Sequence, residues 1–386
     1  MIQTIVIFLY CDNWMNTELQ YKVFDWLRFP LIVGVVLIHS YGKPFDFDAL
    51  DFDCLSGIDY YNLFRVGISQ VLAHVCVPTF YFISGFLFFI ELETWDKIRW
   101  LNKIKRRFKT LLVPFFIWNT ISIIIALIGL LRREGLFGAH SFFIDNGYWH
   151  LYWDCMKWNL DRTNWLGCAN PSSSPYLVQF WFLRDLMVVV ACSPLLYYII
   201  RKTKGWMIFV LFVCYVSGVF FNIPGFSITA FFFFSLGAYM KIYSVNPTVL
   251  TYRYRYGIVI TTIILWLACT LYNGHNTKEG DIIYPFYVVF CLFSLLNIVP
   301  FIIRNRLIVM PKLLSKSTFF IYCSHTIILL PLFNKMMSKI LGEVNPIGMT
   351  VSYLMAPILT IISCILLYYL LNRYFPSICD ILTGDR

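Results

Sequence analysis

Ten apolar segments, separated by polar connections, run through almost the whole chain. Most of them have the length of about 17–25 residues that a helix needs to cross a bilayer. They cover residues 25–41, 71–90, 111–131, 180–200, 206–221, 228–243, 256–272, 283–303, 318–334 and 350–372. A transmembrane barrel would show shorter segments of alternating polarity. The pattern therefore predicts an all-α fold, that of a polytopic membrane protein with about ten transmembrane helices.

The composition excludes a soluble enzyme. Of the 386 residues, 59% are apolar and 13% are charged, whereas an ordinary soluble domain has about 25% charged residues. Aromatic residues make up 19% of the chain, which is the opposite of a disordered composition. The 12 cysteines form no CxxC motif and no paired His/Cys spacing, so we expect no metal site. Cys155 and Cys168 share one long loop and are candidates for a disulfide.

The net charge of +10 belongs to the connections between the apolar segments. Seventeen Lys and Arg fall in alternate connections, and the intervening short ones, 222–227 and 273–282, hold only Lys278. Basic residues favour the cytoplasmic side of a membrane protein. The charges therefore orient the chain, with both termini in the cytoplasm, and predict no nucleic-acid partner. The basic connections are 91–110, 201–205, 241–255 and 304–316.

This topology predicts a cytoplasmic segment (1–24), a membrane domain (25–372) and a cytoplasmic tail (373–386). The longest connection, 132–179, lies outside. The apolar stretch near the N-terminus follows no basic residue and precedes no small-residue cleavage site, which argues against a cleaved signal peptide. Met15 lies shortly before the first long helix and is an alternative start.

Three polar residues interrupt the first predicted helix: Asp25, Arg28 and His39. A charge inside a membrane helix costs about 2.5–3.5 kcal/mol, so each such residue is a candidate functional residue. Arg28 and His39 lie about 20° off the same face and about 16 Å apart along the axis. Such a stripe is expected to face the bundle interior. Two alternatives stay open: Asp25 and Arg28 form an ion pair at the helix start, and His39 is a hydrogen-bonded core residue.

The fourth predicted helix opens with Arg184 and Asp185, at about the expected depth of His39. Adjacent helical residues point about 100° apart, so we expect each to find its partner on another helix. Asp185 is then placed to orient His39, and Arg184 to face developing negative charge. The alternative is an ion-pair network between helices. His325, in the ninth predicted helix, is expected nearer the inner face, and a hydrogen bond between helices is its alternative role.

Two further segments carry candidate site residues. Arg106 and Arg107 open the third predicted helix and are candidates for binding an anionic, phosphate-bearing ligand in the cytoplasm. Their alternative role is to set the topology. The second predicted helix holds Pro78, Ser84 and Gly85 in mid-membrane. Such small or helix-breaking residues allow close packing, or an unwound segment beside a cavity.

Taken together, these segments resemble acyltransferase family 3, a family of integral membrane acyltransferases. The resemblance extends from about residue 20 to 372. The matching stretches, in the family's order, are Asp25-Trp-Leu-Arg28 followed after ten residues by His39, Pro78 with Ile83-Ser84-Gly85-Phe86, Arg106-Arg107 with Pro114, Trp181-Phe-Leu, Phe234-Ser-Leu-Gly237-Ala, and Ile321-Tyr322 with His325.

The resemblance implies a ten-helix protein of the bacterial inner (plasma) membrane that uses cytoplasmic acyl-CoA to acylate a glycan or glycolipid. It implies that His39 is the catalytic residue with Arg28 near it, and that Arg106 and Arg107 contact CoA. Acetyl-CoA is the donor that family habit suggests, giving O-acetylation of a cell-envelope polysaccharide. Aromatic residues of the 132–179 loop suit either stacking on sugar rings or an interfacial belt: Tyr148, Trp149, Tyr152, Trp153, Trp158 and Trp165.

Two rival functions use the same residues differently. In a transporter or flippase, the buried Asp, Arg and His stripe would relay protons or pass a substrate. The chain shows no repeat symmetry between its halves, which weighs against that hypothesis. In a noncatalytic membrane receptor, the stripe would bind without turnover. Consumption of acyl-CoA by the purified protein distinguishes the enzyme from both.

Overall fold

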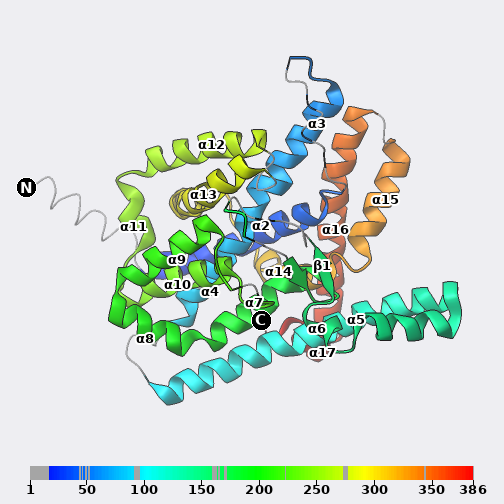
Figure 1. The fold of residues 1–386 in the computed structure, drawn as a ribbon, viewed down its shortest axis with the longest axis horizontal. Coiled ribbons are helices and arrows are strands. Elements are labelled where there is room, and N and C mark those ends of the chain that lie inside the picture. Colours follow the sequence, from blue (N-terminus) through cyan, green and yellow to red (C-terminus); the bar gives the residue numbers. More distant parts are fainter. Residues whose placement is uncertain are drawn as a thin grey trace, which may run out of the picture.

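The computed structural model describes residues 17–42, 45, 47, 50, 53–90, 96–158, 163, 166–168, 172–221, 223–272, 277–342 and 345–385. Met15, Trp165 and Asn222 of the predicted turn lie outside the described residues. Helices dominate the fold (Figure 1). The first half comprises α2 (Thr17–His39), α3 (Gly57–Arg65), η1 (Val66–Leu72), η2 (Ala73–Val75), α4 (Cys76–Phe88), α5 (Lys97–Asn146), α6 (His150–Trp153), η3 (Val178–Phe180), α7 (Trp181–Ala191) and α8 (Ser193–Thr203).

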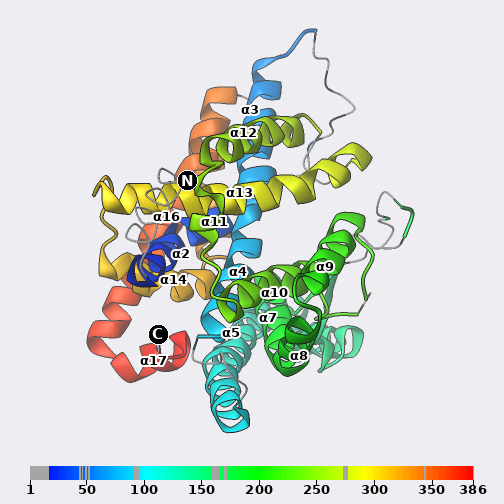
Figure 2. The ribbon, with the colours of Figure 1, turned by 90° about the vertical axis from the view of Figure 1, so that its left-hand side faces the viewer.

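The second half continues with helices only: α9 (Gly205–Ser217), α10 (Ile228–Ile242), α11 (Pro247–Tyr252), α12 (Arg255–Leu271), α13 (Lys278–Arg304), α14 (Lys312–Ser324), α15 (Leu329–Leu341), α16 (Pro346–Tyr374) and α17 (Pro376–Thr383). α2 lies at the centre, where it contacts α4, α13, α14 and α16 (Figures 1 and 2). The polar residues of α2 are therefore surrounded by several other helices.

Each of the ten predicted segments coincides with a helix or with a bent pair of helices. By length and apolar composition, four helices of the described chain are candidate membrane spans, or six if each bent pair is one span. The bent pairs are η3–α7 with α8, at 60°, and α14 with α15, at 82°. α9, α10 and α12 are apolar but shorter. A count of ten spans, with both termini in the cytoplasm, remains a prediction.

The second span begins earlier than predicted, because Gly57–Phe88 is one helical run. Ser56 caps it: the Ser56 hydroxyl accepts from the Asp59 amide, and the Asp59 side chain accepts from the Ser56 amide. This capping box is a strong start signal that hydropathy does not register. Within the run, η1 is π-helical and η2 is a 3-10 turn. Such irregular turns are often found at functional sites.

The predicted external loop, 132–179, contains helices and strands among its described residues. α5 extends through its first part to Asn146, with a kink at Gly135, where φ is +66°. Farther along, β1 (Met156–Trp158) pairs antiparallel with β2 (Ser172–Ser174), so an all-α description is incomplete. The Cys155 thiol donates a hydrogen bond to Asn146 Oδ1 (3.2 Å) rather than forming a disulfide with Cys168. Burial raises the pKa of the Cys155 thiol, which disfavours the thiolate that disulfide formation requires.

The predicted cytoplasmic tail is helical as well. α17 turns back from the end of α16 and packs on α5, as its place beside α5 in Figure 1 shows. The Trp118 indole donates to the Leu382 carbonyl (3.0 Å). A Cβ on Gly384, where φ is +70°, would lie 2.2 Å from the Thr110 carbonyl oxygen. The tail is therefore part of the packed domain.

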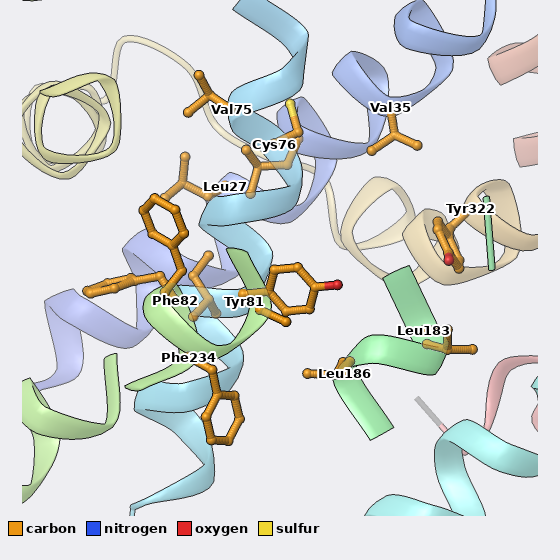
Figure 3. Close-up of a cluster of buried hydrophobic side chains, with 14 of the residues drawn as sticks. Leu27, Val35, Val75, Cys76, Tyr81, Phe82, Leu183, Leu186, Phe234 and Tyr322 are labelled. Atoms are coloured by element: carbon orange, nitrogen blue, oxygen red, sulfur yellow. The ribbon is translucent and has the colours of Figure 1, made fainter. Parts of the chain in front are cut away.

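α4 and α10 pack backbone against backbone. A Cβ built on Gly85 would lie 2.0 Å from the Phe234 carbonyl oxygen, and one on Gly237 would lie 2.1 Å from the Phe82 carbonyl oxygen. Figure 3 shows Phe82 and Phe234 near this crossing. Small residues permit such close approach between membrane helices. Of the two outcomes expected for the mid-membrane segment, close packing is confirmed at Gly85.

Gly85→Ala should therefore force α4 and α10 apart. Overpacking of this kind costs about 1–3 kcal/mol, and the contact here is with backbone that cannot rotate away. We expect a lower midpoint of thermal unfolding in detergent, as measured by tryptophan fluorescence. Gly129→Ala on α5 is the matched control, since a Cβ at that position would have nothing within 4 Å. Equal midpoints for the two variants would contradict this account of the crossing.

Candidate active site

A cavity of about 790 Å³ opens beside the C-terminal end of α2. Segments far apart in the sequence meet at its walls, which come from α2, η2, α4, η3, α7, α9, α10, α13, α14 and the β1–β2 sheet. All three connections predicted to be external contribute described residues to it: 132–179, 222–227 and 273–282. Its polar lining consists of His39, His74, Asp154, Lys157, Ser172, Ser173, Gln179, Arg184, Asp185, Tyr215, Ser227, Thr229, Asp281, Tyr284 and Tyr322.

His39 is the last residue of α2 and lies on the cavity wall. Its imidazole packs against that of His325, with ring centroids 5.3 Å apart and ring planes inclined by 53°. His74, in η2, also lines the cavity and interacts electrostatically with His39. Three imidazoles from three different parts of the fold therefore gather at one place.

His325 lies directly after α14, where the chain turns by 82° into α15. Its side chain is fully buried. Nδ1 lies 2.9 Å from the Ile321 carbonyl oxygen and 3.0 Å from that of Tyr322. The Ile321 carbonyl also accepts the backbone N–H of His325 (3.1 Å), and the Tyr322 carbonyl also accepts the Gln179 side-chain amide (3.4 Å). The imidazole N–H is therefore an additional donor to both oxygens, each of which has two lone pairs. His325 was expected at a different depth from His39, but the bent pair of helices holds the two side by side.

Arg184 and Asp185 form a buried ion pair, with Nε of Arg184 2.9 Å from Oδ1 of Asp185. The expectation that each would find its partner on another helix is wrong for the carboxylate. The Arg184 side chain is long enough to bend back along the first turn of α7. Arg184 also donates from Nη1 to the Trp153 carbonyl (2.8 Å), which ties α7 to the C-terminal end of α6. Both residues line the same cavity as His39.

Asp25 and Arg28 lie away from the cavity. Arg28 Nη1 is 3.2 Å from Asp25 Oδ1, and their side chains are 44% and 58% exposed, respectively. Ser315, in the first turn of α14, donates to the same carboxylate oxygen (2.8 Å). The expected continuous stripe therefore divides: its lower end is a partly exposed ion pair, the alternative weighed above, and its upper end is His39.

The positive charge of Arg107 interacts with that of Arg28 and with that of Arg106. Arg106 is exposed and Arg107 is half-buried on the first part of α5. The structure thus brings together two predicted basic segments that the sequence separates by about eighty residues. We call Arg28, Arg106 and Arg107 the basic cluster.

Ser84 is half-buried on α4. Ser84 is not among the described residues that line the cavity, although Pro78 of the same helix is. In the described parts of the chain, no group of three or more His, Cys, Asp or Glu side chains could hold a metal ion.

Two residues of the site, His74 and Gln179, were not predicted from the sequence. His74 lies in an apolar helical run, and the rule that singled out His39 should also have found it. Gln179 lies in η3, directly before the predicted fourth helix. Its Oε1 accepts from the Thr326 hydroxyl (2.8 Å), and its backbone carbonyl accepts from the Tyr322 hydroxyl (2.7 Å). No local pattern reveals this role, since both partners lie more than 140 residues away.

Comparison with known proteins assigns this arrangement to a class. A family model described as an acyltransferase domain matches residues 21–369, so the chain belongs to acyltransferase family 3 and is a membrane protein of that family. It is similar to the succinoglycan biosynthesis protein ExoH of Rhizobium meliloti (strain 1021). The two are 24% identical over 375 residues, which cover 93% of this chain and 91% of ExoH. No solved structure matches the chain.

Proposed function

We propose that this protein transfers an acyl group from acyl-CoA to a hydroxyl of a cell-envelope glycan, with His39 as the general base. The observation that carries the proposal is the position of the His39 imidazole, on the wall of a 790 Å³ cavity with other histidines beside it. Histidine is the side chain most often used for proton transfer in catalysis. Acetyl-CoA is the proposed donor.

His39 takes the proton of the acceptor hydroxyl while the oxygen forms its bond to the thioester carbonyl carbon. It then returns that proton to the thiolate sulfur as the carbon–sulfur bond breaks, so no proton is gained or lost overall. Arg184 supplies positive charge at the cavity wall where the carbonyl oxygen becomes negative. Asp185 holds the Arg184 side chain in place through the buried ion pair.

The basic cluster is the proposed site for the phosphates of CoA. Guanidinium groups suit phosphate because they can donate two parallel N–H bonds to it. Asp25 offsets only the charge of Arg28, so Arg106 and Arg107 leave an excess of positive charge that a bound anion would balance. In the proposed orientation this end of the molecule faces the cytoplasm, and the thiol end of CoA reaches along α2 toward His39.

The acceptor is proposed to enter from the opposite side. The three connections predicted to be external line the cavity, and they provide both charged and aromatic side chains. ExoH is named for succinoglycan biosynthesis, which favours a glycan as the acceptor here. The side chains of Trp158 and Trp181 offer flat apolar faces to a sugar ring at the cavity wall.

Turnover by the purified protein tests this function. In detergent or nanodiscs, the protein is mixed with acetyl-CoA and with envelope glycan from cells that lack it. We expect thiol release together with a gain of acetyl mass on the glycan. The two bent helix pairs also suit a transporter. Glycan movement across vesicles without any thiol release would therefore contradict the enzyme and favour that second function.

The double variant Arg106→Gln/Arg107→Gln should raise the KM for acetyl-CoA. Each charge-assisted contact to phosphate contributes about 1.5–3 kcal/mol, so a rise of at least tenfold is expected while kcat changes little. Lys105→Gln is the matched control, since Lys105 is exposed on the same turn of α5. If the double variant inserts normally and its KM equals that of the control, Arg106 and Arg107 only set the topology.

A further inference from the structure

The tautomer of His325 is fixed by its surroundings. Carbonyl oxygens only accept hydrogen bonds, and Nδ1 lies within hydrogen-bond distance of two of them, those of Ile321 and Tyr322. Nδ1 therefore carries a proton. In the neutral imidazole Nε2 then has no proton, and it can only accept a hydrogen bond.

Nε2 of His325 is buried and has no hydrogen-bond partner among the described residues. A buried polar atom of this kind normally has a partner. The ring packed against it is that of His39, at a centroid distance of 5.3 Å. Two imidazoles joined by an N–H···N bond of ordinary length have centroids about 5 Å apart. The His39 and His325 rings are therefore at the separation that such a bond requires.

The segment that carries His325 is held from two directions. Gln179 accepts from the Thr326 hydroxyl (2.8 Å) and donates to the Cys323 carbonyl (3.3 Å). Gln179 of η3 therefore holds Cys323 and Thr326, which lie before and after His325 in the chain. Of the described residues, those lining the cavity include His39 and not His325. His325 therefore acts behind His39 and does not contact the acceptor or the donor.

The geometry points to His325 as a positioning residue that accepts an N–H from His39 and so leaves the other nitrogen of His39 without a proton, facing the cavity. This inference rests on the proposed role of His39 as base. During transfer, the acceptor proton goes to the nitrogen that faces the cavity and then to the leaving thiolate. The proton toward His325 stays on His39 throughout. A hydrogen-bond partner that fixes the tautomer of a catalytic histidine has this role in hydrolases.

Two substitutions separate the two nitrogens of His325. His325→Asn keeps an amide donor near the position of Nδ1, so the two carbonyls stay satisfied, but it has no acceptor where Nε2 lies. His325→Gln is longer and brings an amide oxygen to that place. We expect kcat to fall roughly 10–100-fold in the Asn variant, with KM for acetyl-CoA unchanged, and to stay within about threefold of wild type in the Gln variant.

The test measures thiol release from acetyl-CoA with envelope glycan as acceptor, and thermal unfolding of each variant. His140→Asn, the same substitution at an exposed histidine of α5, should leave kcat unchanged. A folded Asn variant with wild-type kcat, or a Gln variant as slow as the Asn variant, overturns the inference. Should the Asn variant not fold, His325→Leu takes its place, because leucine fills the site without an acceptor and should be at least as slow.

A second comparison keeps this inference apart from the proposed function. In the His39→Gln background, adding His325→Asn should cause no further loss, since His325 acts only through His39. If His39→Gln itself keeps wild-type turnover, the proposed function fails and takes the inference with it. If His39→Gln is inactive and His325→Asn is fully active, the proposed role of His39 as base is supported and only the role of His325 is contradicted.

Discussion

His39→Gln should be folded and nearly inactive. A general base removed from acyl transfer typically costs 10²–10⁴-fold in rate, and Gln cannot take up a proton although it fills a similar volume. We expect kcat for transfer from acetyl-CoA to fall by about that factor, with the KM for acetyl-CoA close to wild type. The KM should be unchanged because the basic cluster, the proposed site for CoA, lies at the other end of α2, near Asp25 and Ser315.

His39→Ala is the companion variant, and it should be as inactive as the Gln variant. His74→Gln tests the neighbouring imidazole on the same cavity. Because His74 Nδ1 is held by the Ser69 carbonyl (2.7 Å), within its own helical run, we expect a smaller loss there. Wild-type turnover by purified His39→Gln, or a larger loss in His74→Gln than in His39→Gln, would require a different base.

The helical class was predictable because burial in a bilayer leaves few choices. Apolar runs long enough to span must satisfy their own backbone hydrogen bonds, and the helix does so within one segment. Small residues were equally informative, since Gly85 lies where α4 and α10 touch through their backbones. The boundaries were less predictable. The start of the second span depends on the capping box at Ser56 and Asp59, which hydropathy alone does not register.

The bend after α14 could not be seen in the apolar pattern. Residues 318–334 read as one run, but the chain turns by 82° between Ser324 and Leu329. Pro331 suits the first turn of α15, where its missing N–H costs nothing. The imidazole of His325 then donates to the Tyr322 carbonyl, which a continuous helix would have paired with the backbone N–H of Thr326, and shares the Ile321 carbonyl with the backbone N–H of His325. This turn, rather than any local signal, brings His325 to His39.

The ion pair of α7 shows a second limit of reading periodicity. Helical geometry gives the direction of Cβ, not the position of a guanidinium at the end of a long side chain. Arg184 and Asp185 diverge at the backbone and still meet at 2.9 Å. The partners that Arg184 finds beyond Asp185, the Trp153 carbonyl and the Ser173 hydroxyl, come from an ordered loop with a small sheet that the hydropathy pattern did not predict.

Arg184→Met should strongly destabilise the protein. Arg184 and Asp185 are 4% and 3% exposed, so the substitution leaves a carboxylate buried without its partner. Breaking a buried ion pair from one side costs about 3–5 kcal/mol. We expect the free energy of unfolding, measured by denaturant titration in detergent, to fall by about that amount. Arg184→Lys keeps the positive charge but loses the planar set of guanidinium donors. Its free energy of unfolding should lie between those of Arg184→Met and wild type.

The double variant Arg184→Met/Asp185→Asn separates the structural role of the pair from its role in catalysis. Removing both charges of a buried pair is often neutral for stability. The remaining loss is that of the donor to the Trp153 carbonyl, about 1 kcal/mol, together with the longer contact to the Ser173 hydroxyl. Most of the unfolding free energy should therefore return. If Arg184 also stabilises the developing oxyanion, kcat should stay roughly 10²–10³-fold low in this folded protein. Recovery of both stability and kcat would reduce Arg184 to a structural residue, and the oxyanion donor would then have to lie elsewhere on the cavity wall.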